Sequence, residues 1–429
     1  MALHRGQEEA LIAFLNDIWI GPERTVREVS GDRFAPLRDQ ILKAPPWKGV
    51  IGEPELFRLL WRQLYGAFEY LPPNFEGPLP SASEGGVLKS VAERVRLSLE
   101  ALPSDYDVYI PMAGLRSIEQ PRIDLTSNIS IVDATHDESI RAAIHALGLP
   151  GGLLRALAGM DPVPPSVDSM RYLRIVCGGY GDWSPDSPAI RNALSIAKQF
   201  LFVGLGAGAL VQGGYAFGSG VSLLSAPLVV LQKAGNKESF VSQVGFELSS
   251  FFHQIQFRSQ LTVPVMGGAS SLLSGMTRPA IGADDLRDAI RSSMTTAIDF
   301  MMVNSSDAMA VRAAMEWYID AEASQNESIA FLQRCIGLEA LLGGGESRRE
   351  VTERLADRYA YTVGHTESER RNCRDGFKSM YAHRSEIVHG RATQLSATHR
   401  VANSEARSML RLAAWREMNS IVRAAKISG

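Results

Sequence analysis

The chain has 429 residues, of which 45% are apolar and 21% are charged, and its formal net charge is −3. These values are typical of a globular protein with two or three domains. The three cysteines, Cys177, Cys335 and Cys373, have no paired spacing. Their spacing excludes a disulfide framework and a cysteine-rich zinc cluster, and it favours a reducing, cytoplasmic compartment.

The N-terminal segments are expected to be helical. Apolar residues recur at helical spacing over residues 7–20, 53–70 and 87–102. Prolines and glycines between residues 71 and 86 predict a break and a first candidate domain boundary. The chain turns acidic at Glu8 and Glu9 before any apolar run, so a secretory signal is not expected.

Strands are expected to follow from residue 107 onward. Runs rich in β-branched and aromatic residues predict strands over residues 107–112, 129–132 and 170–177. Helices are predicted over residues 137–147 and 189–203. Prolines mark a second candidate boundary at residues 161–169. Residues 1–280 are therefore expected to form a mixed α/β region.

A long uncharged segment lies between Lys198 and Lys233. A membrane span needs about 20 predominantly apolar residues, and here the apolar run extends only over residues 200–211. We therefore expect a buried helix, a glycine-rich loop and a strand over residues 228–231, without membrane insertion. Residues 204–209 also match a relaxed dinucleotide-binding fingerprint, but they follow a predicted helix and lack the later acidic residue, so no cofactor is expected.

Residues 283–429 are expected to form a bundle of five or six helices, which makes the whole fold α+β with helix predominating. Helices are predicted over residues 283–302 and 307–323, and in the second of them the core positions are Val311, Ala314, Met315 and Tyr318. Residues 331–429 carry 17 Lys and Arg against 11 Asp and Glu, whereas residues 1–330 carry 27 against 36. A basic C-terminal region is what contact with RNA phosphates requires.

Candidate catalytic residues lie in the segment His383-Arg384-Ser385-Glu386-Ile387-Val388-His389-Gly390. The planar guanidinium of Arg384 matches a phosphate, and His389 can exchange a proton near neutral pH. Residues five apart in one helix point about 140° away from a common face. Gly390 offers a helix end at which His389 can turn toward Arg384, and a symmetric dimer offers a second route. Alternatively, both residues only stabilise the negative end of the helix dipole.

The remaining histidines are predicted to be solitary. Thr135 and the acids after His136 favour an ordinary helix start there. His145, His253, His365 and His399 have no companion at metal-ligand spacing. No metal site is therefore expected.

Three segments of the C-terminal region agree in order and spacing with a known family: residues 331–342, which contain LEALL, residues 354–360, RLADRYA, and residues 377–390, which end in YAHRSEIVHG. This order resembles the HEPN superfamily of small helical bundles, most closely its Apea-like branch, over residues 306–426. The resemblance implies a metal-independent endoribonuclease. Other members of the superfamily bind RNA or nucleotides without cutting, so a non-catalytic dimerisation and binding module for RNA, a nucleotide or a protein is the alternative.

The resemblance also implies roles for individual residues. The family motif is an arginine, a short run beginning with a polar residue, and a histidine, and it matches Arg384, Ser385 and His389. Arg384 would hold the scissile phosphate, and His389 would transfer protons while the RNA 2′-hydroxyl attacks. Ser385 and Tyr381 are expected to orient this pair or the RNA, and Glu339 is expected to be a buried counter-charge for an arginine of the bundle.

The expected partners follow from the same resemblance. They are RNA, a second copy of the chain bound through the C-terminal bundle, and a protein or ligand trigger bound by residues 1–280. A toxin-like nuclease that is held inactive by residues 1–280 fits prokaryotic antiviral defence or a stress response.

Overall fold

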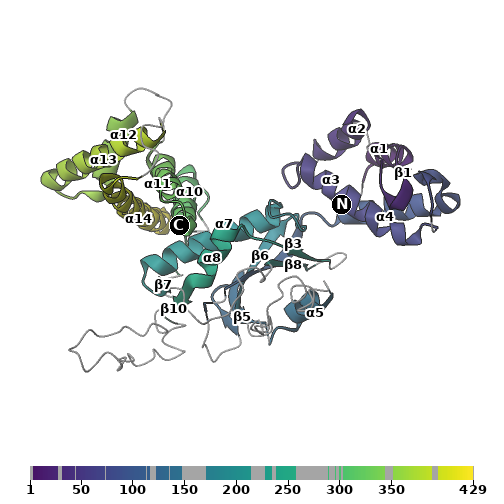
Figure 1. The fold of residues 1–429 in the computed structure, drawn as a ribbon, viewed down its shortest axis with the longest axis horizontal. Helices are drawn as coiled ribbons and strands as arrows, with labels where there is room; N and C mark the ends of the chain where they lie inside the picture. Colours follow the sequence, from purple (N-terminus) through teal and green to yellow (C-terminus); the bar gives the residue numbers. More distant parts are fainter. Residues whose placement is uncertain are drawn as a thin grey trace. The chain divides into compact units, whose positions relative to one another are not determined.

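The computed structural model of the chain describes residues 3–27, 31–43, 45–72, 74–112, 114–115, 122–134, 136–146, 171–213, 228–233, 238–257, 288, 295, 299–300, 303–343, 351–388 and 395–428 (Figure 1). Helix makes up 64% and strand 15% of the structure, which confirms an α+β fold with helix predominating.

The chain divides into two compact units. The first comprises Met1–Val108, Val176–Ala193 and Val229–Gln243, and the second comprises Tyr109–Ile175, Leu194–Leu228 and Val244–Gly429. The domain boundaries expected at residues 161–169 and 280–283 lie outside the described residues.

The first unit contains the helices α1 (Arg5–Asn16), α2 (Gly31–Leu42), α3 (Glu53–Gly66) and α4 (Gly86–Glu100). Apolar side chains from all four helices form one core, to which Leu79 and Ala82 of the 3-10 helix η3 (Leu79–Gly85) also belong. The helices expected over residues 53–70 and 87–102 are confirmed, although the first ends in a separate 3-10 helix, η2 (Phe68–Tyr70). The proline-rich segment between α3 and α4 therefore packs within this unit.

The helix expected over residues 7–20 is shorter than predicted. α1 ends at Asn16, and Trp19–Ile20 form the strand β1, which pairs antiparallel with β2 (Gly77–Pro78). Ile18 and Ile20 are buried whereas Trp19 is exposed, and this period of two fits a strand. A short 3-10 helix, η1 (Pro22–Arg24), follows. Pairing with β2 thus decides the conformation of residues that continue an apolar helical pattern.

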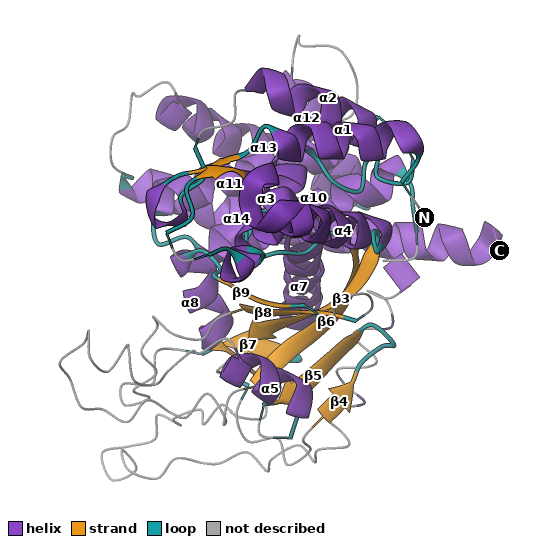
Figure 2. Ribbon diagram, turned by 90° about the vertical axis from the view of Figure 1, so that its right-hand side faces the viewer, coloured by secondary structure: helices purple, strands orange, loops and turns teal. Residues whose placement is uncertain are grey.

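A six-stranded sheet has the strand order β4-β5-β6-β3-β8-β9 (Figure 2). Its strands are β3 (Ser104–Pro111), β4 (Arg122–Asp124), β5 (Ile129–Asp133), β6 (Arg171–Gly179), β8 (Leu228–Gln232) and β9 (Ser239–Ser242). β5 pairs antiparallel with both neighbours, so that Ile131 lies opposite Ile123 and Leu173, and all three are buried. The four strands predicted from the sequence are confirmed. A smaller antiparallel pair joins β7 (Leu210–Gln212) to β10 (Ile255–Phe257).

The C-terminal part of the second unit is helical, with α10 (Ser306–Ala323), α11 (Glu327–Leu342), α12 (Val351–Val363), α13 (Glu367–Val388) and α14 (Ala397–Ser428). Figure 1 shows these helices packed against one another. The positions predicted to form the core face of α10 are all buried: Val311, Ala314, Met315 and Tyr318. The helix expected over residues 283–302 lies largely outside the described residues. The unit also contains α5 (Glu138–Ala146) and α8 (Phe246–Gln254).

The glycines at residues 204–206 have a packing role. They lie in the last turn of α7 (Pro188–Gly206), a helix that the sequence predicted over residues 189–203. A Cβ atom on Gly206 would lie 2.7 Å from the Trp415 ring of α14. Glycine therefore allows α7 and α14 to approach closely. In the part of the chain that the structure describes, no helix is both long and apolar enough to span a bilayer.

The three cysteines carry free thiols, as their spacing predicted. Cys177 and Cys335 are buried, and burial raises the pKa of each thiol to about 12. Both thiols therefore stay protonated and unreactive at neutral pH.

Gly376 lies inside α13, where a glycine weakens a helix. A Cβ atom at this position would meet Met409 Cε at 3.7 Å, which is ordinary van der Waals contact. We expect Gly376→Ala to raise the free energy of unfolding by about 0.5–1 kcal/mol, because alanine loses less backbone entropy than glycine on folding. Hydrogen exchange of peptides from α13 would measure this gain, and faster exchange in the variant would contradict it.

Candidate functional site

Helix α13 carries the predicted catalytic motif and has a defined start and a defined buried face. Thr366 Oγ1 accepts the backbone N–H of Glu369 at 3.2 Å, and the Glu369 carboxylate accepts the N–H of Thr366 at 3.1 Å. This reciprocal pair is a capping box. Further along the helix, Phe377 packs against α12 and Met380 against α11. These contacts place the next two turns, residues 381–388, at the edge of the bundle.

Arg384 is held there by Glu339 of α11 and Tyr381 of α13. Its Nη2 lies 3.0 Å from Glu339 Oε1, and its guanidinium carbon lies 5.4 Å from the centre of the Tyr381 ring. The Tyr381 hydroxyl donates to the same Oε1 at 2.8 Å. Burial, and then the hydrogen bond to Glu339, raise the pKa of Tyr381, so the phenol remains a donor at neutral pH. The guanidinium therefore has a defined position.

The Arg384 side chain is 27% exposed and that of Glu339 is 31% exposed. Glu339 is thus the ion-pair partner of a bundle arginine, as the sequence indicated, but it is partly exposed rather than buried. Tyr381 and Glu339 belong to one cluster with Arg384, whereas Ser385 lies on the exposed side of α13. The partial exposure of the Arg384 side chain leaves part of its guanidinium open to a ligand from solvent.

His389 and Gly390 lie outside the described residues. The convergence of His389 with Arg384, and the helix end at Gly390, therefore stay predictions. α13 as described ends at Val388, directly ahead of His389 in the sequence.

A second cluster joins α13 to the first turn of α14. Glu386 Oε2 lies 3.4 Å from His383 Nδ1 and 2.9 Å from His399 Nε2. The centres of the two imidazole rings are 5.1 Å apart. The hydrogen bonds of Glu386 with His383 and with His399 lower the pKa of Glu386, so this group stays a carboxylate at neutral pH.

The prediction that His399 has no companion was wrong. His383 and Glu386 are three residues apart on one helix, a spacing that places two side chains on a common face. This local spacing is the one signal in the sequence that indicates part of the cluster. His399 joins it only because α14 packs against α13, which no sequence spacing encodes.

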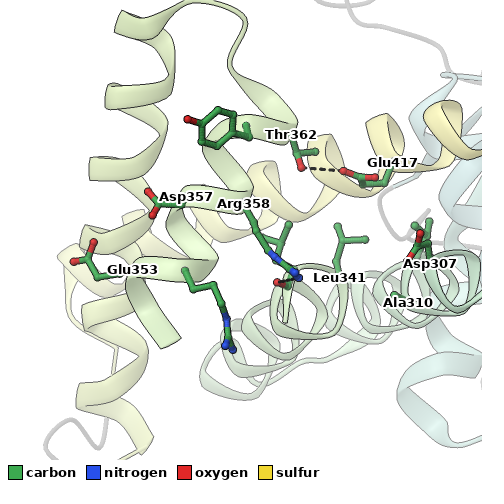
Figure 3. Close-up of a pocket in the computed structure, with 12 residues that line it drawn as sticks. Asp307, Ala310, Leu341, Glu353, Asp357, Arg358, Thr362 and Glu417 are labelled. Atoms are coloured by element: carbon green, nitrogen blue, oxygen red, sulfur yellow. Dashed lines mark hydrogen bonds between the residues drawn. The ribbon is translucent and has the colours of Figure 1, made fainter. Parts of the chain in front are cut away.

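A cavity of about 760 Å³ lies among α10, α11, α12 and α14 (Figure 3). Figure 3 shows Arg358 extending from α12 and the hydrogen bond between Thr362 and Glu417, which is 2.9 Å long. Arg358 donates to the carbonyl oxygen of Leu342, the last residue of α11, at 2.8 Å. The charged residues of the lining are Asp307, Glu353, Asp357, Glu417, Arg354 and Arg358. Two of these carboxylates, Glu353 and Asp357, are paired with Arg374 of α13 at 2.8 Å. Arg384 does not line it, and we therefore place the candidate site at the end of α13.

No protein-family model, no curated protein and no solved structure matches the chain. The HEPN resemblance accordingly stays a prediction from the three sequence segments.

Proposed function

We propose that the C-terminal helical region is a HEPN-type endoribonuclease that cleaves RNA without a metal and has Arg384 and His389 as its catalytic residues. The observation that carries this proposal is the fixed, partly exposed guanidinium of Arg384, which lies five residues before His389 in the sequence. The basic surplus of residues 331–429 supports contact with phosphates. The same proposal includes a role in prokaryotic defence or stress, in which a protein or ligand that binds residues 1–280 activates the nuclease.

In the proposed reaction the RNA supplies its own nucleophile. His389 takes the proton of a ribose 2′-hydroxyl, and the 2′-oxygen forms a bond to the adjacent phosphorus. The bond from phosphorus to the 5′-oxygen breaks, and this leaving oxygen takes up a proton from an imidazolium. Arg384 donates N–H groups to the non-bridging oxygens and stabilises the growing negative charge. The products end in a 2′,3′-cyclic phosphate and a 5′-hydroxyl.

Glu339 and Tyr381 would act as positioning residues. The ion pair uses Nη2 of Arg384, and the Tyr381 ring limits the rotation of the guanidinium. A side chain held in this way has less freedom to lose when it binds the transition state. A phosphate can approach the exposed part of the guanidinium while the contact with Glu339 persists.

The proposal is tested by incubating the purified full-length chain with total RNA in EDTA. We expect cleavage with cyclic phosphate ends, and a fall of about 100-fold or more in His389→Ala, because general acid–base catalysis contributes about 10²- to 10⁴-fold. His365→Ala removes an exposed histidine before α13 and should leave the rate unchanged. RNA that stays intact with the wild-type chain would remove the enzyme proposal.

The ion pair itself favours a second candidate, a helical module that binds RNA, a nucleotide or a protein without cutting and forms a homodimer. Glu339 already compensates much of the Arg384 charge, and a compensated guanidinium stabilises a phosphorane-like transition state less than a free one. RNA that is retained but uncut in EDTA, together with a solution mass of two copies, would support this module over the enzyme.

A further inference from the structure

The side chains of His383, Glu386 and His399 bring two imidazole nitrogens and one carboxylate oxygen within 4.8 Å of one another. Both imidazoles approach the same oxygen, Oε2 of Glu386. The His399 side chain is 9% exposed, whereas Glu386 is 45% exposed. The cluster therefore has a buried wall and an open side through which an ion can enter.

We infer that His383, Glu386 and His399 bind a divalent transition-metal ion, for which Zn²⁺ is the best chemical match. Two histidines and one glutamate are a recognised zinc ligand set that leaves a fourth position for water. Tetrahedral bonds of about 2.0–2.1 Å separate neighbouring ligand atoms by about 3.4 Å. From Glu386 Oε2, His383 Nδ1 at 3.4 Å matches that spacing, whereas His399 Nε2 at 2.9 Å lies about half an ångström closer and would move outward when an ion binds.

Ser396 supplies a supporting contact to the buried histidine. Its Oγ lies 2.6 Å from His399 Nδ1 and 2.8 Å from Thr398 Oγ1. Without an ion, Nδ1 accepts the backbone N–H of Ser396 at 3.2 Å, so the ring proton is on Nε2. When an ion binds Nε2, the ring proton moves to Nδ1, which then donates to Ser396 Oγ. A hydrogen bond to the non-ligating nitrogen is the usual way in which a protein orients a metal-binding imidazole. Without an ion, a proton on Nε2 bridges the 2.9 Å to Glu386 instead.

An ion at this position would connect the end of α13 to the start of α14. His389 lies between the ligands Glu386 and His399 in the sequence, so the ion would hold a residue on each side of the proposed general base. The inference does not rest on the ribonuclease proposal, because ion binding and thermal stability can be measured without RNA.

The test uses the full-length chain, freed of metal with EDTA and then exchanged into EDTA-free buffer. Calorimetric titration with ZnCl₂ should show one ion per chain, and Co²⁺ should give the visible absorption of a tetrahedral nitrogen and oxygen site. His383→Gln and Glu386→Gln change partly exposed residues and should weaken Zn²⁺ binding by more than 100-fold while the fold persists. Ser396→Ala should weaken it by about 10- to 100-fold, as removal of a supporting contact does.

Two matched variants exclude other zinc ligands. His365→Ala removes a histidine just before α13, and Cys373→Ser removes a thiol within α13; neither should change the affinity. A wild-type chain that binds no Zn²⁺ would overturn the inference and leave an ordinary hydrogen-bonded cluster. Unchanged Zn²⁺ binding in His383→Gln and Glu386→Gln would overturn it as well.

Discussion

Replacing Arg384 with alanine is expected to slow RNA cleavage by about 100- to 1,000-fold, the usual effect of removing one donor that stabilises transition-state charge. The substitution removes the guanidinium that Glu339 and Tyr381 hold in place. The lost ion pair is partly exposed, and such pairs contribute about 1 kcal/mol or less to stability. The variant should therefore remain folded, and the initial rate of cleavage of a labelled RNA in EDTA measures the effect directly.

Two further variants test whether cleavage requires the planar guanidinium at residue 384 or only a positive charge on α13. Arg384→Lys keeps the positive charge but loses the planar fork, so it should stay close to the alanine variant in rate. Arg371→Ala removes an arginine of the same helix that is 71% exposed and pairs with Glu367, and it should cleave like the wild-type chain. Wild-type cleavage by Arg384→Ala would mean that this guanidinium contacts no reacting phosphate.

Glu322→Ala is expected to lower the stability of the C-terminal helices by about 3–5 kcal/mol, as the removal of one partner from a buried ion pair does. The Glu322 side chain is 5% exposed and lies 2.9 Å from Nη2 of Arg334, whose side chain is 9% exposed. Nε of Arg407 donates to the same carboxylate at 2.8 Å. Without Glu322, one buried and one partly exposed guanidinium lose their counter-charge.

The measurement must report on these helices because the chain has two compact units. Hydrogen exchange in peptides from α10, α11 and α14 gives the local free energy of opening. Glu367→Ala is the matched control, because Glu367 is 91% exposed and its ion pair is on the surface; its effect should stay within about 0.5 kcal/mol. Equal protection in Glu322→Ala and wild type would show that the buried pair contributes nothing net.

Short-range patterns predicted most of the regular structure. In α10 the spacing of Val311, Ala314, Met315 and Tyr318 identified the buried face, and the β-branched run at residues 129–132 identified β5. Both signals depend on residues within one or two turns or one strand. They can therefore be recognised before any tertiary contact is known.

Elements with weaker local signals were missed or misassigned. α2 has a low mean hydropathy and contains Pro36, yet Phe34, Leu37 and Ile41 from it are buried in the core of the first unit. β1 continues an apolar helical pattern but pairs with β2 instead. In both places, packing against residues far away in the sequence outweighs the secondary-structure preference of the local sequence.

By itself, the sequence determined the order of the C-terminal helices, the basic surplus of the region, and the presence of Arg384, His383 and His389 in one polar segment. Only the tertiary structure decided which of these groups meet. Glu339 reaches Arg384 and His399 reaches Glu386 from other helices, because helix packing brings together residues that are far apart in the chain. Helical periodicity and helix capping depend on residues a few positions apart. Which side chains form ion pairs or share a metal site depends on how the helices of the bundle pack.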